Sequence, residues 1–402
     1  MIVPYSARQW TSLPTRSRRD PPLDSSDRMP IISETLQEEL LSSMRGNEFS
    51  KSGAVAIDLF CGAGGLTCGL IQSGLPVVAG YDVDESCQYA YEKNNKGAKF
   101  FLRNISDISS AEVNRQFGKA KFKVLVGCAP CQPFSRYTLK HRQSSDKWEL
   151  LRDFSRIIRG TRPHIVSMEN VPDLVHYTVF HDFLDSLERG GYFFTRNTET
   201  QIIYCPDYGI PQMRRRLVIL ASRLKPIEIL PPTHPPESYL TVRDVLCDMP
   251  PLDAGEKCQA DPLHRCSRLS PLNLKRIRHS IPGGSWGDWP RKLVALCHQR
   301  NSGETYPSVY GRMEWNRPAP TITTLFFGYG NGRFGHPDQD RAISLREGAI
   351  LQTFPNDYFF CESENNITFS KIGRMIGNAV PVRLGAVIGK SILKHIISYT
   401  SK

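Results

Sequence analysis

Short apolar segments alternate with helical patterns from Ala54 to Ser222, and this alternation constrains the fold more than any other feature. Five apolar runs read VAIDLF, VVAGYD, KVLVGC, HIVSMEN and RLVILAS. Strands that are buried on both faces read as continuous apolar runs, which is typical of parallel sheets with crossover helices. The sequence therefore predicts an α/β fold in which helices cover a parallel sheet.

The rest of the chain divides by composition. Residues 1–51 are polar and read as an N-terminal arm, partly flexible. Residues 265–317 are strongly basic, with ten Lys or Arg against three Asp or Glu. We expect three further parts, namely a catalytic domain at 52–225, a smaller domain at 226–345, and a C-terminal segment at 346–402 that returns to the catalytic domain.

The formal net charge is +11, from 51 Lys or Arg and 40 Asp or Glu. This excess favours a polyanionic partner, although a diffusely basic surface would account for it equally well. No signal peptide and no run of about 18 apolar residues is evident, so we expect no membrane contact. The eleven cysteines are odd in number and scattered, which is typical of free thiols in a reducing cytoplasm.

Two cysteines stand three residues apart in the stretch VGCAPCQPFS, which follows the third apolar run. Cys128 and Cys131 have the spacing of a zinc pair, a redox pair or a lone nucleophile. A structural zinc site needs a second pair of ligands, and no other cysteines or histidines match, so we expect no metal. The spacing alone does not decide between a redox pair and a lone nucleophile.

A glycine-rich loop, DLFCGAGG, ends the first apolar run. Gly62, Gly64 and Gly65 allow a tight turn and close approach to a ligand at a helix N-terminus. Asp82 ends the second run, where a carboxylate can bind a ribose. Thr67 stands in place of the third glycine of a dinucleotide fingerprint. The loop alone fits a plain turn, but together with Asp82 it predicts a nucleoside-type cofactor.

Six motifs occur in order: DLFCGAGG, PCQ, ENV, QxRxR, RPAPTITT and GNAVPV. This series resembles the DNA (cytosine-5)-methyltransferase family, of the compact bacterial restriction–modification type, over residues 54–390 apart from the stretch after Lys225. The resemblance implies a Rossmann-like, S-adenosylmethionine-dependent large domain and a smaller, mostly irregular or β target-recognition domain. It implies methylation of carbon 5 of cytosine within a specific duplex DNA sequence.

The resemblance also implies S-adenosylmethionine as the cofactor. Phe60 would stack on its adenine, Asp82 would hold its ribose, and Asn378 would lie near its methionine part. Asn104 occupies the place of a family aspartate, and its amide oxygen can still accept a hydrogen bond. The full set of expected cofactor residues is Asp58, Phe60, Gly62, Gly64, Gly65, Asp82, Val83, Asn104, Ile105, Pro130, Asn378 and Ala379.

The chemistry follows from cytosine, because its carbon 5 becomes nucleophilic only after a group adds to carbon 6. By the resemblance Cys131 is that thiolate nucleophile, and Cys128 has a packing role only. Glu169 would share a proton with ring nitrogen 3, and Arg216 would hold the oxygen at carbon 2. The expected catalytic set is Cys131, Gln132, Glu169, Asn170, Arg214 and Arg216.

A target cytosine inside a duplex must be flipped out before it can react. Residues 134–148 are charged and lack a core pattern, so we expect a loop that closes over DNA. Basic residues of the smaller domain are candidates for contacts to phosphates or guanines. They are Arg276, Arg278, Arg291, Arg300 and Arg312.

The expected partner is double-stranded DNA, bound by a cytoplasmic monomer that associates with the nucleoid; a cognate restriction endonuclease acting on the same site is a further candidate partner. Three alternatives remain, namely an RNA (tRNA) cytosine-5 methyltransferase, a DNA-binding protein without catalysis, and a nicotinamide oxidoreductase. The long basic stretch favours DNA over tRNA, the intact catalytic set favours an enzyme, and the missing third glycine disfavours nicotinamide.

Overall fold

The computed structural model describes residues 52–130, 146–300 and 307–401. Several predicted features therefore lie outside the described residues. They are the N-terminal arm, Cys131, Gln132 and most of the loop expected at 134–148.

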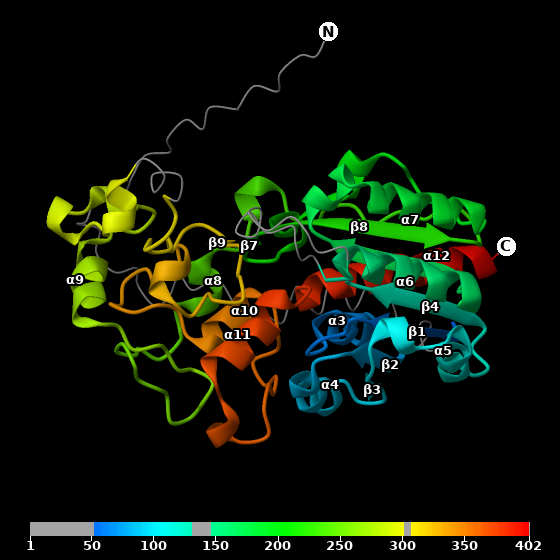
Figure 1. Ribbon diagram of the computed structural model, residues 1–402, viewed down its shortest axis with the longest axis horizontal. Coiled ribbons are helices and arrows are strands. Elements are labelled where there is room, and N and C mark those ends of the chain that lie inside the picture. The colour runs from blue at the N-terminus through cyan, green and yellow to red at the C-terminus, as the bar shows by residue number, and fades with distance from the viewer. Residues whose placement is uncertain (1–51, 131–145, 301–306, 402) are drawn as a thin grey trace, which may run out of the picture. The chain divides into compact units, whose positions relative to one another are not determined.

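Seven strands form one sheet, namely β1 (Ala54–Leu59), β2 (Val77–Asp82), β3 (Lys99–Leu102), β4 (Phe122–Gly127), β5 (Ile165–Asn170), β6 (Ile202–Tyr204) and β8 (Arg215–Ser222). Their order is β3-β2-β1-β4-β5-β8-β6 (Figure 1). The first five strands in this order pair in parallel, and β8 runs antiparallel to both of its neighbours. The predicted α/β fold with a largely parallel sheet is confirmed.

The prediction was wrong for the fifth apolar run, because β8 is antiparallel. A parallel connection needs a crossover of a dozen or more residues, usually a helix. Only a short 3-10 turn, Cys205–Tyr208, and the two-residue strand β7 (Gln212–Met213) lie between β6 and β8. The chain therefore reverses direction there. Strands β3 and β6 are short and lie at the two edges of the sheet, and they have too few apolar residues to stand out in the sequence.

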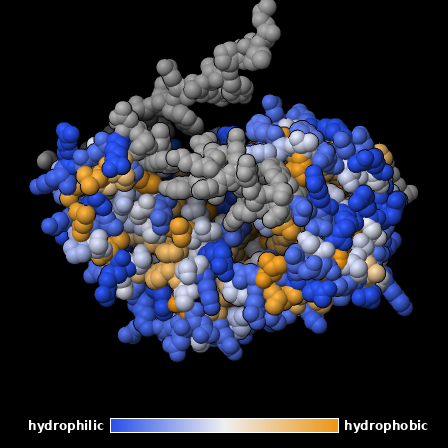
Figure 2. All heavy atoms as spheres, in the orientation of Figure 1, coloured by the Kyte–Doolittle hydropathy of each residue, from blue (hydrophilic) through white to orange (hydrophobic). Residues whose placement is uncertain are grey.

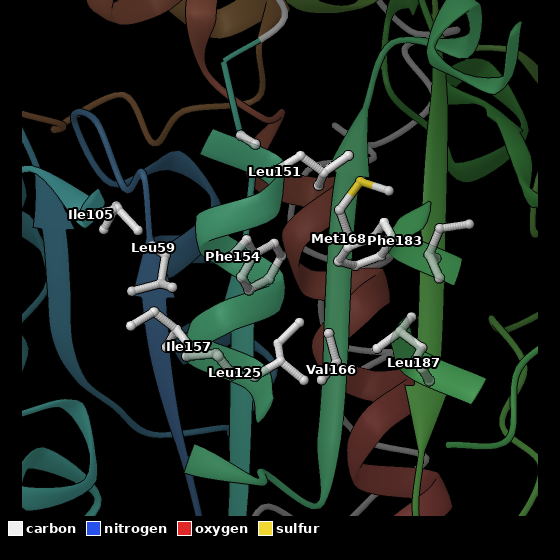
Figure 3. Close-up of a cluster of buried hydrophobic side chains, with 14 of the residues drawn as sticks. Leu59, Ile105, Leu125, Leu151, Phe154, Ile157, Val166, Met168, Phe183 and Leu187 are labelled. Atoms are coloured by element: carbon white, nitrogen blue, oxygen red, sulfur yellow. The ribbon is translucent and has the colours of Figure 1, made fainter. Parts of the chain in front are cut away.

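Helices cover both faces of the sheet. One layer consists of α5 (Ser110–Phe117), α6 (Asp146–Thr161) and α7 (Thr178–Arg189). Figure 3 shows Phe154 and Ile157 of α6 lying over Leu59, Leu125 and Val166 of the central strands. The other face carries α3 (Gly65–Gln72) and α12 (Val382–Thr400), which pack against each other.

Helices α3 and α12 touch backbone to backbone. A Cβ atom on Gly69 would lie 2.1 Å from the carbonyl oxygen of Val382, and one on Gly385 would lie 2.8 Å from that of Leu66. A Cβ on Gly65, in the first turn of α3, would lie 2.6 Å from the carbonyl of Val380. The C-terminal segment therefore returns to the glycine-rich loop, and glycine is needed where the two segments meet.

The segment Phe369–Thr400, which contains α11 (Phe369–Asn378) and α12, is long and apolar enough to cross a membrane. No apolar run of this length was expected from the sequence. Because 67% of the apolar window is buried inside the structure, the segment fits a core helix of the fold. The face of the molecule drawn in Figure 2 is largely hydrophilic, with small apolar patches.

Residues 226–345 contain little regular structure. The described elements there are short 3-10 turns, α8 (Val242–Leu246), α9 (Pro271–His279) and β9 (Ala319–Pro320). They surround a separate small cluster of buried side chains, which includes Ile277, Trp289 and Tyr329. β9 pairs with β7 in parallel, so the RPAPTITT motif contacts the QxRxR motif directly. After this region come α10 (Leu345–Leu351) and α11.

A fully buried ion pair joins the segment before α10 to the first turn of that helix. Arg341 donates two hydrogen bonds of 2.7 Å to the two carboxylate oxygens of Glu347, and neither residue is exposed to solvent. Glu347 also closes a capping box with Ser344 at the start of α10. Burial opposes ionisation of Glu347, but its bonds to Arg341 dominate and lower its pKa to about 2.

We expect Glu347→Gln to lower the free energy of unfolding by about 3–5 kcal/mol at pH 7, because it leaves the Arg341 charge buried without its partner.

The same ion pair makes the stability of the wild type depend on pH. The ordinary pKa of the Glu347 carboxyl is 4.5 and its folded pKa is about 2. The carboxylate therefore stabilises the fold above pH 4.5, and this contribution disappears as the pH falls towards 2. Urea unfolding from pH 3 to 8 measures both effects. The exposed pair Arg196–Asp185 is the control, and Arg196→Gln should change little; equal losses in the two variants would contradict the prediction.

Candidate active site

The predicted site residues gather at the carboxyl edge of the sheet, where ligands bind in open α/β folds. The pairing register aligns the ends of the central strands, with Leu59 beside Gly127 and Gly127 beside Met168. Asp82 ends β2 at the same edge. The glycine-rich loop, the PCQ segment and the ENV segment are therefore neighbours in space although they are far apart in sequence.

The glycine-rich loop and Asp82 are joined by hydrogen bonds. The amide of Gly62 donates to Asp82 Oδ2 over 2.8 Å, and the amide of Asp84 donates to Oδ1 over 2.9 Å. Burial raises the pKa of Asp82. The two amide bonds fix the direction of the carboxylate, and each oxygen keeps a lone pair for a further donor.

The loop begins in a left-handed conformation at Phe60, whose φ is 64°. This φ is uncommon for a residue with a side chain and costs of order 1–3 kcal/mol. The Phe60 ring is half-buried and meets Phe154 edge-on, with 6.5 Å between ring centroids. Gly64 also has a positive φ, of 90°, and a Cβ there would lie 2.4 Å from the Asn95 amide nitrogen. Among the described residues, Phe60 is one of four residues other than glycine with a positive φ, and it stands where a ligand is expected.

Asp58 is buried under this loop with an incomplete set of partners. Its Oδ2 accepts a 2.7 Å hydrogen bond from the Thr67 hydroxyl, while Oδ1 has no partner among the described residues. Burial raises the pKa of Asp58 to about 7. Thr67, which breaks the dinucleotide pattern, is therefore the residue that donates to Asp58 Oδ2, a role that sequence reasoning missed.

We expect Asp58→Asn to become more stable relative to the wild type as the pH rises from 4 to 8. The folded pKa of about 7 lies above the ordinary 3.8, so the folded wild type retains a proton that the unfolded chain releases, and it loses stability over this range. Asparagine carries no such proton. The gain should reach about 4 kcal/mol at pH 8, measured by urea unfolding, with the exposed Asp107→Asn as control. A pH-independent difference would show that Asp58 is charged throughout.

The other expected cofactor residues lie around the same edge in different settings. Val83 is 66% exposed directly after Asp82. Asn104 is exposed, and its side chain accepts a hydrogen bond from the Ser106 amide. The Ile105 side chain, by contrast, is buried in the main core. Asn378 is exposed at the end of α11.

The carboxylate of Glu169 is buried at the end of β5, with 2% exposure. Arg216 Nε lies 2.9 Å from its Oε1 in an ion pair. The approach is not aligned as a hydrogen bond, because Oε1 has no hydrogen-bond partner among the described residues. On the other side, the Cys128 thiol donates a hydrogen bond to Oε2 over 2.7 Å. Cys128 therefore does more than pack, contrary to the expectation from the sequence.

Arg214 is also buried, and its hydrogen bonds join distant motifs. Its Nη1 donates to the carbonyl of Ile322 over 3.0 Å, and its Nη2 donates to that of Ala379 over 3.4 Å. Burial and then the nearby Arg216 lower the pKa of Arg214 to about 9. Arg214 thus links the RPAPTITT and GNAVPV segments beneath the site.

Asn170 lies beside the PCQ segment. Its amide donates a 3.1 Å hydrogen bond to the carbonyl of Ala129, and its Oδ1 accepts one from the amide of Val171. Pro130 is exposed at the end of this described stretch. The next residues, Cys131 and Gln132, lie outside the described residues, so the structure gives no geometry for them.

A network of buried amides completes the support of the site. Gln212 Oε1 accepts from the amide of Ile322, and Gln212 Nε2 donates to Gln352 Oε1 over 2.9 Å. Gln352 Nε2 donates in turn to the carbonyl of Ile376 over 2.7 Å. Sequence reasoning missed Gln352, since a glutamine at the end of a short helix carries no signal of burial. Across the described residues, no group of three or more His, Cys, Asp or Glu side chains is placed to hold a metal ion.

The five candidate arginines of the smaller domain fall into two groups. Arg276 and Arg312 are buried; Arg276 donates to the carbonyl of Leu293, and Arg312 donates to that of His336. These two hold the small cluster together. The exposed ones are Arg278, Arg291 and Arg300.

A family model and two curated relatives match most of this chain. The family model described as C-5 cytosine-specific DNA methylase matches residues 55–394. The Type II methylase M.HgiDII of Herpetosiphon aurantiacus is 54% identical over 86% of this chain and 96% of its own length. The Type II methyltransferase M1.HphI of Haemophilus parahaemolyticus is 28% identical over 84% of this chain and 86% of its own.

Solved structures share the fold. A putative DNA modification methyltransferase encoded within a prophage of E. coli has a TM-score of 0.65 at 20% identity, covering 86% of this chain and 99% of its own. The Spodoptera frugiperda DNMT2 mutant has a TM-score of 0.56 at 17% identity, covering 86% and 99%. At these identities the likeness establishes the fold alone.

Proposed function

This chain belongs to the C-5 cytosine-specific DNA methylase family, and we propose that it methylates carbon 5 of cytosine within a specific duplex DNA sequence by a covalent mechanism, with S-adenosylmethionine as the methyl donor. The observation that carries the proposal is the buried Glu169 carboxylate. It lies at the carboxyl edge of the sheet, between Arg216 and the segment that leads to Cys131.

The residues at the ends of β1 and β2 fit the proposed cofactor. Asp82 is oriented by two backbone amides and keeps acceptor capacity for ribose hydroxyls. Phe60 is partly exposed and offers a ring face for adenine, and Asn378 is exposed at the end of α11. Its neighbour Ala379 lies beside Gly65 of the glycine-rich loop. The buried Oδ1 of Asp58, which has no hydrogen-bond partner in the described part of the chain, marks a polar position that a bound group can satisfy. S-adenosylmethionine supplies an electrophilic methyl group on a sulfonium.

The proposed reaction starts with the Cys131 thiolate. Its sulfur forms a bond to carbon 6 of cytosine, and the displaced electron pair makes carbon 5 nucleophilic. Carbon 5 then takes the methyl group. A water molecule removes the proton from carbon 5, and the sulfur–carbon 6 bond breaks to regenerate the thiolate. Pro130 and Gln132 flank the nucleophile in sequence.

Glu169 acts on the other edge of the ring in this scheme. A carboxyl group that gives a proton to nitrogen 3 neutralises the charge that develops when the thiolate adds. Arg216 forms an ion pair with Glu169, and we propose that it also contacts the oxygen at carbon 2. Arg214 and Asn170 act through the backbone, since they hold the carbonyls of Ile322 and Ala129.

We expect Cys131→Ser to abolish methylation while cofactor affinity stays at the wild-type level, because the substitution keeps the side chain small and most of the expected cofactor residues lie on other segments. Asp82→Ala is the complementary variant, and it should weaken cofactor binding by about 1.5–3 kcal/mol through lost hydrogen bonds to a charged group. Methyl transfer from labelled cofactor to duplex DNA and calorimetry of cofactor binding measure the two effects. Transfer to total tRNA in place of DNA, or normal turnover by Cys131→Ser, would contradict the proposal.

Target recognition is proposed to reside in a smaller domain at 226–345. The separate hydrophobic cluster around Ile277 and Trp289 supports this division, because a domain needs a core of its own. The catalytic domain would combine 52–225 with the returning segment 346–402. The target cytosine is proposed to flip out of the duplex between them. Exposed Arg278, Arg291 and Arg300 are the candidates for DNA contacts.

Replacing residues 226–316 with the matching region of M1.HphI should change the methylated sequence and leave cofactor binding unaltered. In the unmodified chain, Arg291→Ala should remove either a contact to a DNA phosphate or a contact to a guanine. A lost phosphate contact lowers the salt slope of DNA binding by about one unit, whereas a lost guanine contact relaxes one position of the site by about 1–3 kcal/mol. Bisulfite sequencing and salt titrations measure these outcomes. A chimera that keeps the original target would place recognition elsewhere in the chain.

The biological setting is proposed from the relatives. Several are named Type II methylases or methyltransferases, and enzymes of restriction–modification systems protect the sites that a partner endonuclease cleaves. We propose a cytoplasmic monomer that associates with the DNA of the nucleoid. A cognate endonuclease that cuts the same sequence is the expected companion, and resistance of DNA from expressing cells to such an enzyme would test it.

A further inference from the structure

Cys128 and Glu169 are neighbours because of strand register. β4 and β5 pair in parallel, with Gly127 beside Met168. The next residue of each strand places Cys128 next to Glu169, where the thiol donates a 2.7 Å hydrogen bond to Oε2. One position further, Asn170 contacts the carbonyl of Ala129. The two contacts continue the alignment of the two strands beyond their last paired residues, and both involve side chains of β5.

The Glu169 carboxylate meets a different group on each side. Arg216 of β8 approaches Oε1, and the thiol of Cys128, after β4, occupies Oε2. Two further titratable groups influence this region, namely Arg214, before β8, and the buried Cys205, whose pKa burial raises to about 12. Among the described side chains, the Cys128 thiol is therefore the small, neutral group that makes a hydrogen bond to the Glu169 carboxylate.

A thiol suits a carboxyl group that gains and loses a proton. Sulfhydryl groups can donate a hydrogen bond and can also accept one weakly. When Glu169 is charged the thiol donates to Oε2. A protonated carboxyl group keeps acceptor capacity, so the thiol can still donate to Oε2 while the carboxyl proton is directed at cytosine. The same contact then persists through the proton transfer to cytosine. A charged partner at this position would favour one state strongly and oppose the other.

We propose that Cys128 is a positioning residue for the methylation reaction, which holds the Glu169 carboxyl group in its reactive orientation through the Sγ–Oε2 hydrogen bond. The proposal rests on the proposed role of Glu169 as proton donor to cytosine. Cys128 takes no part in covalent chemistry in this scheme.

The test uses the full-length protein, unmethylated plasmid DNA and labelled S-adenosylmethionine, with kcat and KM measured from pH 5.5 to 9. Cys128→Ala and Cys128→Val remove the hydrogen bond. We expect kcat to fall about tenfold, with KM for DNA and cofactor affinity unchanged. Loss of a donor to the charged carboxylate disfavours the charged form. The part of the pH–kcat profile that depends on this group should therefore move to higher pH.

Cys128→Ser is the conservative variant, because its hydroxyl can donate and accept in the same place, and it should restore most of kcat and the original profile. Cys247→Ser, at an exposed cysteine remote from the site, is the matched control and should behave as the wild type. Unchanged kcat and pH profile in Cys128→Ala would overturn the proposal. A folded Cys128→Ser that behaves like the alanine variant would overturn it as well.

A double-mutant comparison guards against a purely structural effect. If Cys128 acts through Glu169, adding Cys128→Ala to Glu169→Gln should reduce kcat no further. Independent, multiplying losses would reject the positioning role even if the single variants are less stable. Failure of the wild type to methylate DNA, or full activity of Glu169→Gln, would instead reject the proposed function, so the two failures are distinguishable.

Discussion

The side-chain amide of Gln212 joins three stretches of the chain that are far apart in sequence. Its oxygen accepts from the backbone of Ile322, and its nitrogen donates to Gln352, which in turn bonds to the end of α11 at Ile376. All of these groups are buried, where an unpaired amide costs about 1–3 kcal/mol. The site therefore depends on this network, because it fixes the RPAPTITT and GNAVPV segments against the strand that carries Arg216.

The basic character of the chain overstates how much positive charge is available to a polyanion. Arg214, Arg276, Arg312 and Arg341 are all buried, and each donates to backbone carbonyls or to a carboxylate. A guanidinium offers five donors in a rigid plane and can therefore tie several segments together where the backbone is irregular. In the region after Lys225, which has few strands and helices, arginine provides the interactions that regular hydrogen-bond ladders provide in the sheet.

Much of the fold was predictable because buried parallel strands leave a strong apolar signal. The runs that form β1, β2, β4 and β5 were identified in this way, and their ends carry Asp82 and Glu169 as expected. The antiparallel direction of β8 was not predictable from its composition, since direction depends on the connection and not on the strand itself. Chemical partners were the hardest to foresee. Thr67 beneath Asp58 and Cys128 beside Glu169 depend on contacts between separate strands and helices, and the burial of Arg276 and Arg312 depends on tertiary packing.

The backbone contact between α3 and α12 has a consequence for how the protein folds as it is synthesised. α3 follows the first strand of the sheet, whereas its partner helix leaves the ribosome only after about 300 further residues, roughly 15–60 s later at about 5–20 residues per second. During that interval the face of the sheet that α12 covers, where Ser222 later bonds to His395, has no C-terminal helix to shield it. Such long-range contacts slow folding and leave apolar surface open to chaperones or to aggregation. Soluble yield in cells should therefore be more sensitive to bulky substitutions at Gly69 and Gly385 than the equilibrium stability of the finished enzyme is.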